Sequence, residues 1–175
     1  MDARLIAGPL VGRPFGGLAI LLKKELINLA SLVITNDRFL VVSISSWLVI
    51  NVYLPCSGTS NRFRLNIIDD ILCELQSILD THSDKEYIIG GDFNVELDVN
   101  SVFSSVINTF VSDNKLQRTD HLFPIVNKET YVNETLQMSS CLDYIVTSDS
   151  ISTVAFNVLD LDLNFSDHLP VMIVC

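Results

Sequence analysis

The sequence predicts a single mixed α/β domain in which helices cover β-sheets. The chain has 175 residues, the length of one domain, and 49% of them are hydrophobic, enough for a substantial core. Short β-rich apolar runs are interspersed with two segments of helical periodicity. Because no internal repeat or linker interrupts this pattern, we treat residues 1–175 as one domain.

The first half of the chain predicts three strands followed by a helix. Continuous apolar or β-branched runs indicate buried strands at Leu18 to Leu22, Phe39 to Ser45 and Trp47 to Leu54. A helix follows, with Ser60 or Asn61 as its N-cap. Its apolar stripe consists of Ile67, Ile68, Ile71, Leu72, Leu75, Ile78 and Leu79.

The charge-free segment from Phe39 to Asn61 is long enough to suggest a membrane helix. Polar residues and Pro55 interrupt it, and it is rich in Val and Ile. Two adjoining buried strands explain this composition better, so we expect no membrane span.

The second half predicts a further strand, a helix and three closing strands. The run Tyr87 to Ile89 leads into Gly90-Gly91, and an amphipathic stripe predicts a helix from Val102 to Val111. The closing strands are expected at Leu142 to Thr147, Val154 to Leu161 and Leu169 to Val174.

The segment Gly90-Gly91-Asp92-Phe93-Asn94 is the strongest chemical signal. Side chains two residues apart in a strand point the same way, so Asp92 and Asn94 are expected to face one site while Phe93 faces the other side. A carboxylate, an amide and glycines that permit close approach suit a metal, water or phosphate. The plain alternative is a polar strand exit with Asn94 in a turn. A calcium-binding EF-hand is excluded, because its sixth and twelfth positions would be Leu97 and Phe103.

Three other positions carry candidate chemistry. Asp167-His168 precedes the last strand and pairs a carboxylate with an imidazole that titrates near neutrality, although a capped turn with a surface histidine is the alternative. Asp143 lies inside an apolar strand and needs a partner, for which His168 is the obvious candidate. Tyr53 either points into the same region or packs in the core. Serine-nucleophile catalysis is disfavoured because no Gly-x-Ser-x-Gly elbow is present.

Charge and cysteine usage restrict the partners. The chain has 11 Lys and Arg against 21 Asp and Glu, a net charge of -10, and nucleic-acid binding usually needs a basic patch. Tight unaided DNA binding is therefore disfavoured, whereas a metal-assisted phosphate site is not. The four cysteines are scattered, with no Cys-x-x-Cys pair, which predicts buried free thiols in a reducing, intracellular compartment.

Four motifs, taken in order, resemble the endonuclease/exonuclease/phosphatase superfamily of metal-dependent phosphodiesterases. They are Tyr53-Leu54-Pro55, Gly91-Asp92-Phe93-Asn94, Leu142-Asp143-Tyr144-Ile145 and Ser166-Asp167-His168-Leu169-Pro170. The segments Gly12 to Ala19 and Asn51 to Cys56 look typical of the apurinic-endonuclease-like domain of non-LTR retrotransposons. The resemblance covers nearly the whole chain.

The resemblance implies a four-layered α/β/β/α sandwich of two mixed sheets flanked by helices. It also implies attack of water on a phosphodiester, assisted by Mg²⁺ or Mn²⁺. DNA is the implied substrate, bound weakly because the chain is acidic. A nuclear location and a reverse transcriptase within a longer polyprotein follow from the same resemblance.

The resemblance also assigns a role to each candidate residue. Asp92 would orient or deprotonate the water, and Asn94 would help to hold the water and the phosphate. Tyr53 would contact the phosphate. Asp143 would orient His168, which would stabilise the phosphoryl oxygens. The metal ligands would include Asp167, Asp92 and Asn94.

The chain departs from the family pattern at its front. The family opens with a strand carrying an Asn, a helix, and a strand ending in Gln-Glu, whose Glu is a principal metal ligand. Here the first glutamate is Glu25, after the first predicted strand, and the next is Glu74 on the predicted helix. We therefore expect an N-terminally incomplete domain with impaired activity. The alternatives are a catalytically dead remnant or binding module, and a phosphatase of the same fold acting on a small phosphoester or lipid head group.

Overall fold

A computed structural model describes residues 17–56, 60–123, 128–159 and 166–175 of the chain. Residues 12–16, which begin one of the retrotransposon-like segments, lie outside this range. None of the helices formed by the described residues is sufficiently long and apolar to span a membrane.

A six-stranded mixed sheet forms the centre of the fold, and its strand order is β1-β2-β3-β4-β8-β5. The strands are β1 (Ala30–Thr35), β2 (Phe39–Ile44), β3 (Trp47–Tyr53), β4 (Glu86–Asp92), β8 (Asp143–Ser148) and β5 (Leu116–Arg118). Strands β3 and β4 pair in parallel, with a helix between them in sequence, and the other neighbours are antiparallel. The carboxyl ends of β3 and β4 therefore lie at the same edge of the sheet.

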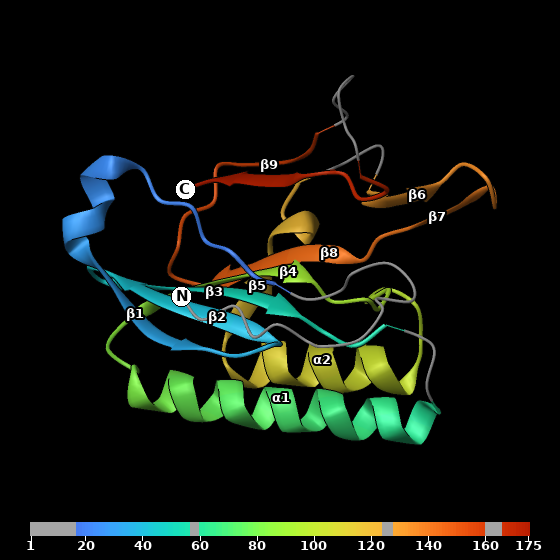
Figure 1. The fold of residues 1–175 in the computed structure, drawn as a ribbon, viewed down its shortest axis with the longest axis horizontal. Coiled ribbons are helices and arrows are strands. Elements are labelled where there is room, and N and C mark those ends of the chain that lie inside the picture. Colours follow the sequence, from blue (N-terminus) through green and yellow to red (C-terminus); the bar gives the residue numbers. More distant parts are fainter. Residues whose placement is uncertain (1–16, 57–59, 124–127, 160–165) are drawn as a thin grey trace, which may run out of the picture.

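The two helices, α1 (Asn61–Thr81) and α2 (Val102–Asp113), lie on one face of this sheet (Figure 1). The antiparallel pair β9 (Ala155–Val158) and β10 (Val171–Val174) lies on the opposite face. A hairpin of β6 (Tyr131–Asn133) and β7 (Met138–Ser140) projects beside the start of β8. Two short 3-10 helices, η1 (Lys24–Leu29) and η2 (Thr119–His121), complete the elements. The predicted mixed α/β fold is confirmed.

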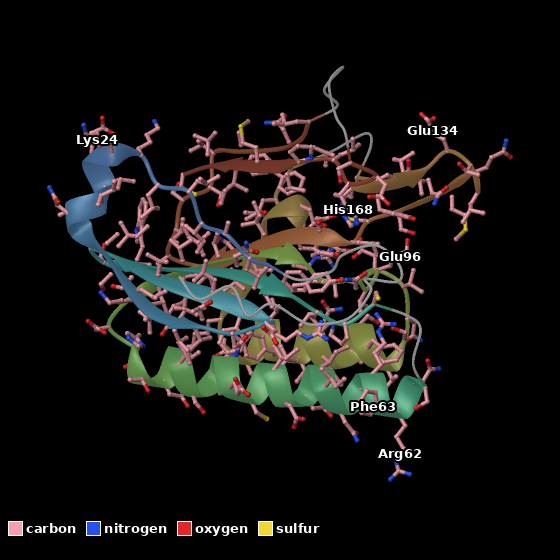
Figure 2. The ribbon with its side chains drawn as sticks, in the orientation of Figure 1. Lys24, Arg62, Phe63, Glu96, Glu134 and His168 are labelled. Carbon is pink, nitrogen blue, oxygen red and sulfur yellow. The ribbon has the colours of Figure 1, made fainter. Side chains whose placement is uncertain are left out.

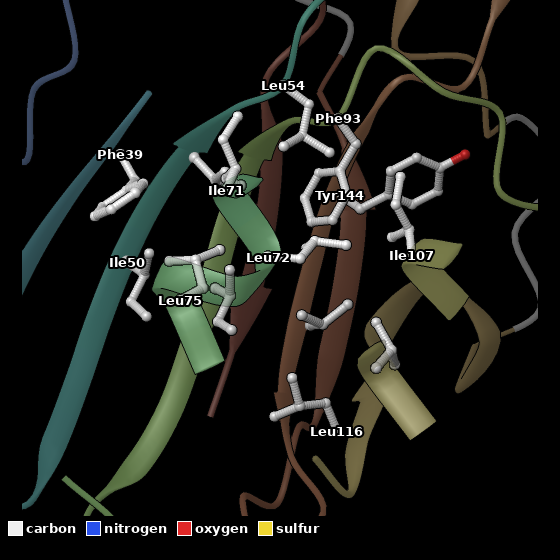
Figure 3. Close-up of a cluster of buried hydrophobic side chains, with 14 of the residues drawn as sticks. Phe39, Ile50, Leu54, Ile71, Leu72, Leu75, Phe93, Ile107, Leu116 and Tyr144 are labelled. Carbon is white, nitrogen blue, oxygen red and sulfur yellow. The ribbon is translucent and has the colours of Figure 1, made fainter. Parts of the chain in front are cut away.

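Both helices begin where their side chains can cap them. The Ser60 hydroxyl accepts a hydrogen bond from Phe63 N, as the sequence predicts. Ser101 and Ser104 form a reciprocal capping box at the start of α2. The apolar stripes of α1 and α2 pack against the sheet in one core, which includes Phe39, Ile50, Leu75, Ile107 and Tyr144 (Figure 3).

The first predicted strand is wrong. Residues 18–22 are described but form no strand; the Ala19 carbonyl accepts a hydrogen bond from the Asn51 side chain, 3.1 Å away. The strand beside β2 is instead β1, which starts at Ala30. An apolar run becomes a strand only where a neighbouring backbone supplies ladder hydrogen bonds, and no described strand pairs with residues 18–22.

Smaller differences concern strand lengths and cysteines. The predicted strand at Val154 to Leu161 is β9 over four residues, and residues 160 and 161 lie outside the described part of the chain. The cysteines are free, but Cys56, Cys73 and Cys175 are exposed and Cys141 is half-buried, so their predicted burial is wrong. Cys73, for example, lies on the outer side of α1, away from its apolar stripe.

Candidate active site

The register of three adjacent strands places three of the predicted residues in one row. Tyr53, the last residue of β3, is paired with Asp92, the last residue of β4. Asp92 is in turn paired with Asp143, the first residue of β8. Residues distant in sequence therefore meet at one edge of the sheet, where the chain leaves β3 and β4 and enters β8.

Gly91 allows β4 to approach β3 at this edge. Its φ is +145°, and a Cβ built there would lie 1.9 Å from the Val52 carbonyl oxygen. The glycine was expected to let a ligand approach the backbone; the group that approaches is the neighbouring strand. Gly91 therefore supports the position of Asp92 indirectly.

Asn94 turns back toward Asp92. Its φ is +52°, a left-handed conformation that asparagine tolerates well. Its backbone N–H donates to Asp92 Oδ1 at 2.8 Å, and its side-chain Nδ2 donates to Asp92 Oδ2 at 2.9 Å and to the Leu54 carbonyl at 2.9 Å. Phe93, between them, is 4% exposed and packs edge-on against Tyr144, with ring centroids 5.5 Å apart (Figure 3). Asn94 therefore lies in a turn at the exit of β4 and, in the same turn, holds the carboxylate of the candidate site.

Asp143 and His168 form the predicted pair. His168 Nδ1 lies 2.8 Å from Asp143 Oδ2, and both side chains are partly exposed. The hydrogen bond to Asp143 is the main cause that raises the pKa of His168 above its usual value; burial opposes it, and Asp92 and Asp167 add to the rise. Figure 2 shows His168 near the start of β8. The imidazole therefore holds its proton more firmly than a free histidine.

The pKa of Asp92 is raised well above its ordinary value. Burial raises its pKa to about 6, repulsion from Asp143 contributes to the rise, and the Asn94 hydrogen bonds and His168 oppose it. A carboxylate crowded by a second carboxylate and partly removed from water is stabilised by a nearby cation. A perturbed pKa of this kind is typical of functional sites.

The geometry suits a divalent cation. Ligand atoms of Asp92, Asp143 and His168 all lie within 4.8 Å of one another. Carboxylate oxygens with an imidazole match the donors that Mn²⁺ accepts, and Mg²⁺ takes one or two carboxylates with water. This group contains no glutamate, in agreement with the departure noted in the sequence.

Two other predicted residues lie beside this group. Tyr53 is half-buried, and burial raises the pKa of its phenol. Cys56 and Asp92 add to this rise, while the Arg38 guanidinium, 5.6 Å from the ring centroid, and the Asn94 side chain oppose it. The Asp167 carbonyl accepts a hydrogen bond from Val132 N at 2.8 Å. Its carboxylate is near enough to influence His168 but is outside the group of three. Metal ligation by Asp167 stays a prediction.

Two residues of the site were missed from the sequence. Thr130 is fully buried, and its hydroxyl accepts hydrogen bonds from the backbone N–H groups of Leu142 and Asp143, each at 2.9 Å. Its carbonyl accepts from Leu169 N at 2.6 Å, so it fixes the chain on both sides of the Asp143–His168 pair. The Tyr131 ring lies 5.1 Å from the His168 ring. Neither residue belongs to a recognisable local motif, and no sequence signal indicates them.

A cavity of about 500 Å³ extends from the site between the central sheet and β10. Asp143, His168 and Ser166 line its polar end. Its remaining walls are largely apolar and include Val49, Ile88, Ile145, Leu169 and Val171. The candidate site is therefore open to a ligand from the side of β10.

A second cluster of metal-ligand residues, Asp98, Asp120 and His121, has a different explanation. The buried Arg118 guanidinium binds Asp98 at 2.7 Å and Asp120 at 2.6 Å. Both carboxylates are already paired with a cation, and the Lys128 ammonium lies 3.7 Å from Asp120, so this cluster is an ion-pair network of the fold.

Comparisons with known proteins bear on the family and the fold of the chain. A family model described as "Endonuclease/Exonuclease/phosphatase family" matches residues 5–168. A comparison with curated protein sequences gave no match. Among solved structures, a variant of the 3' phosphatase NExo from Neisseria, bound to product DNA hairpin, matches with a TM-score of 0.64 and 17% identity. The match covers 77% of this chain and 63% of the phosphatase.

A 3'-5' exonuclease (NExo) from Neisseria meningitidis also has a TM-score of 0.64, with 19% identity. The match covers 79% of this chain and 64% of the exonuclease. The chain thus spans less than two thirds of either solved protein. At these identities the likeness shows the fold.

Proposed function

Because this chain belongs to the endonuclease/exonuclease/phosphatase family, we propose that it is a divalent-metal-dependent phosphodiester hydrolase that nicks DNA, with Mg²⁺ or Mn²⁺ as its cation. The observation that carries the proposal is the convergence of Asp92, Asp143 and His168 within 4.8 Å. These residues come from three separate sequence motifs, and Asp143 and His168 also line the cavity.

The pKa shift and hydrogen bonds of each residue indicate its role in the proposed reaction. Asp92, with a pKa of about 6, is largely ionised at neutral pH and still basic enough to orient a water and accept its proton. Asn94 fixes both oxygens of that carboxylate. Asp143 binds Nδ1 of His168 and so orients the ring, and on this proposal His168 contacts a phosphoryl oxygen. The raised pKa of His168 favours the charged form of the ring, which would stabilise developing negative charge on the phosphate.

Asp92 and Asp143 would hold the cation, with Asp167 as a further ligand. When bound, the cation would polarise the phosphoryl group and lower the pKa of a bound water. Tyr53, beside Asp92 in the register, would contact the phosphate from β3.

The finer assignment is a retroelement endonuclease domain. The segment Asn51 to Cys56 supports this assignment. The DNA product bound to one structural neighbour, a 3' phosphatase, supports only DNA as the substrate. On this proposal the domain works in the nucleus, beside a reverse transcriptase in a longer polyprotein. The net charge of -10 favours weak DNA binding that depends on the cation.

The test is nicking of supercoiled plasmid by the purified chain at neutral pH and moderate salt. We expect Mg²⁺- or Mn²⁺-dependent nicking that EDTA stops and that Asp92→Ala lowers at least ~100-fold. Asp113→Ala, which removes an exposed carboxylate from the end of α2, is the matched control and should nick at the wild-type rate. Nicking that survives Asp92→Ala would sink the proposal.

Two further assays separate the alternatives. Turnover of an inositol phosphate or a choline phosphodiester without DNA nicking would identify a small-phosphoester hydrolase of the same fold. Absence of turnover on all three substrates, together with no Mn²⁺ binding in isothermal titration, would identify a catalytically dead remnant or binding module.

A further inference from the structure

Arg64 links the two loops that carry the proposed site. It lies in the first turn of α1 and is 8% exposed. Its Nε donates to the Pro55 carbonyl at 2.9 Å, and its Nη2 donates to the Asn94 carbonyl at 2.7 Å. Pro55 follows Tyr53 by two residues, and Asn94 follows Asp92 by two. One guanidinium therefore ties together the ends of β3 and β4.

This position is unfavourable for a cation. None of the ion pairs among the described residues includes Arg64, so no carboxylate offsets its burial. The first turn of a helix also repels positive charge, because the helix dipole is positive there. The favourable contacts are the two loop carbonyls and the Phe103 ring of α2, whose centroid lies 4.4 Å from the guanidinium carbon. An apolar residue would fill this place on α1 without those costs.

Arg64 binds the backbone carbonyl of Asn94, and Asn94 in turn binds the carboxylate of Asp92. Asn94 is in the left-handed conformation, and its N–H and side-chain amide hold the two oxygens of Asp92. Asn94 Nδ2 also reaches the Leu54 carbonyl, on the loop that Arg64 contacts through Pro55. A change at Arg64 would thus release the turn that aims Asp92.

We propose that Arg64 is a positioning residue that clamps the loops after β3 and β4 and so holds Asp92 and Asn94 in their reactive arrangement. The inference rests on the proposed function. Arg64 acts through the two carbonyls and does not touch the substrate. A planar fork with donors in fixed directions can serve two carbonyls at once, whereas a lysine ammonium on a flexible stem is a single compact charge.

The experiment uses the full chain with Arg64→Lys, and Arg64→Met as a second variant. Arg62→Met is the matched control, because Arg62 lies in the same helical turn and points away from the protein (Figure 2). We expect kcat for plasmid nicking to fall ~10- to 100-fold in Arg64→Lys, the loss typical of removing a group that orients a ligand. KM should change less than about threefold, since no substrate contact is removed.

A second readout does not need activity. The Asn94 amide, which is bonded to Asp92 Oδ1, should lose protection from hydrogen exchange in Arg64→Lys, while amides in the middle of β3 and β4 keep theirs. Arg62→Met should change neither readout. If the wild-type chain does not nick DNA but Arg64→Lys still removes the protection of the Asn94 amide, the role of Arg64 as a clamp stands and the proposed function is refuted.

Three results would overturn the inference. One is wild-type kcat and wild-type Asn94 exchange in Arg64→Lys, in a chain whose nicking depends on Asp92. Another is a uniform rise of exchange across the sheet, which would indicate a general loss of stability. The third is failure of both Arg64 variants to fold, which would assign Arg64 a purely structural role.

Discussion

Replacing Asp92 by asparagine should make the stability of the chain less dependent on pH. Burial, with repulsion from Asp143, raises the pKa of Asp92 from 3.8 to about 6. Between these values the folded chain holds a proton that the unfolded chain has released, so the free energy of unfolding falls as the pH rises. The asparagine variant has no such proton, and its free energy of unfolding should fall less over the same window.

The magnitude follows from the pH window. Between pH 5 and pH 7.5, the wild-type free energy of unfolding changes mainly from pH 5 up to the folded pKa of about 6. This interval of about one pH unit corresponds to a loss of about 1.4 kcal/mol. Asp92 is only partly buried, and solvent screening reduces the figure to about 1 kcal/mol. Comparing the change with pH, and not the stability at one pH, removes the constant cost of the altered hydrogen bonds to Asn94.

The assay is urea unfolding followed by circular dichroism, at fixed ionic strength with EDTA present. Between pH 5 and pH 7.5, the free energy of unfolding of Asp92→Asn should fall by about 1 kcal/mol less than that of the wild type. Asp69→Asn, which removes one exposed charge from α1, provides the baseline for a change in net charge. If the wild-type and Asp92→Asn curves run parallel, Asp92 is not held in an unfavourable ionised state, and the electrostatic argument for a cation at this position fails.

The remaining predictions concern the backbone at Gly91 and the Asp143–His168 pair. Gly91→Ala should lower the free energy of unfolding by more than about 2 kcal/mol, because the added Cβ would lie 1.9 Å from the Val52 carbonyl. Gly90→Ala should cost less in the same urea assay, because its Cβ would lie 3.3 Å from an Ile145 side-chain atom and 3.7 Å from the Tyr144 carbonyl oxygen. Equal losses would contradict the steric argument. Asp143→Asn should move the alkaline limb of the pH–rate profile for nicking to lower pH, because the Asp143 hydrogen bond is the main cause of the raised pKa of His168. An unmoved limb would show that His168 does not need its proton for the reaction.

Much of the candidate site could be predicted because its signals are local. A strand that ends in Gly-Gly-Asp-Phe-Asn directs its carboxylate away from the core by alternation alone, and Phe93 is buried as that alternation requires. Asp143 needed a partner because it lies in an apolar strand, and His168 supplies it at 2.8 Å. The helices α1 and α2 could also be predicted, because their apolar stripes depend only on residues three or four positions apart.

Other features depended on neighbours that are distant in sequence. Residues 18–22 have the composition of a strand, but β1 occupies the place beside β2, since ladder partners decide which apolar run becomes a strand. Thr130 and Arg64 organise the site through backbone carbonyls and N–H groups, which every residue carries, so no residue pattern marks them. The sequence alone determined which side chains can do chemistry at the strand ends. The tertiary structure decided which of them meet, how far their pKa values move, and which buried groups hold them, because distance, burial and hydrogen-bond partners exist only after the strands have paired.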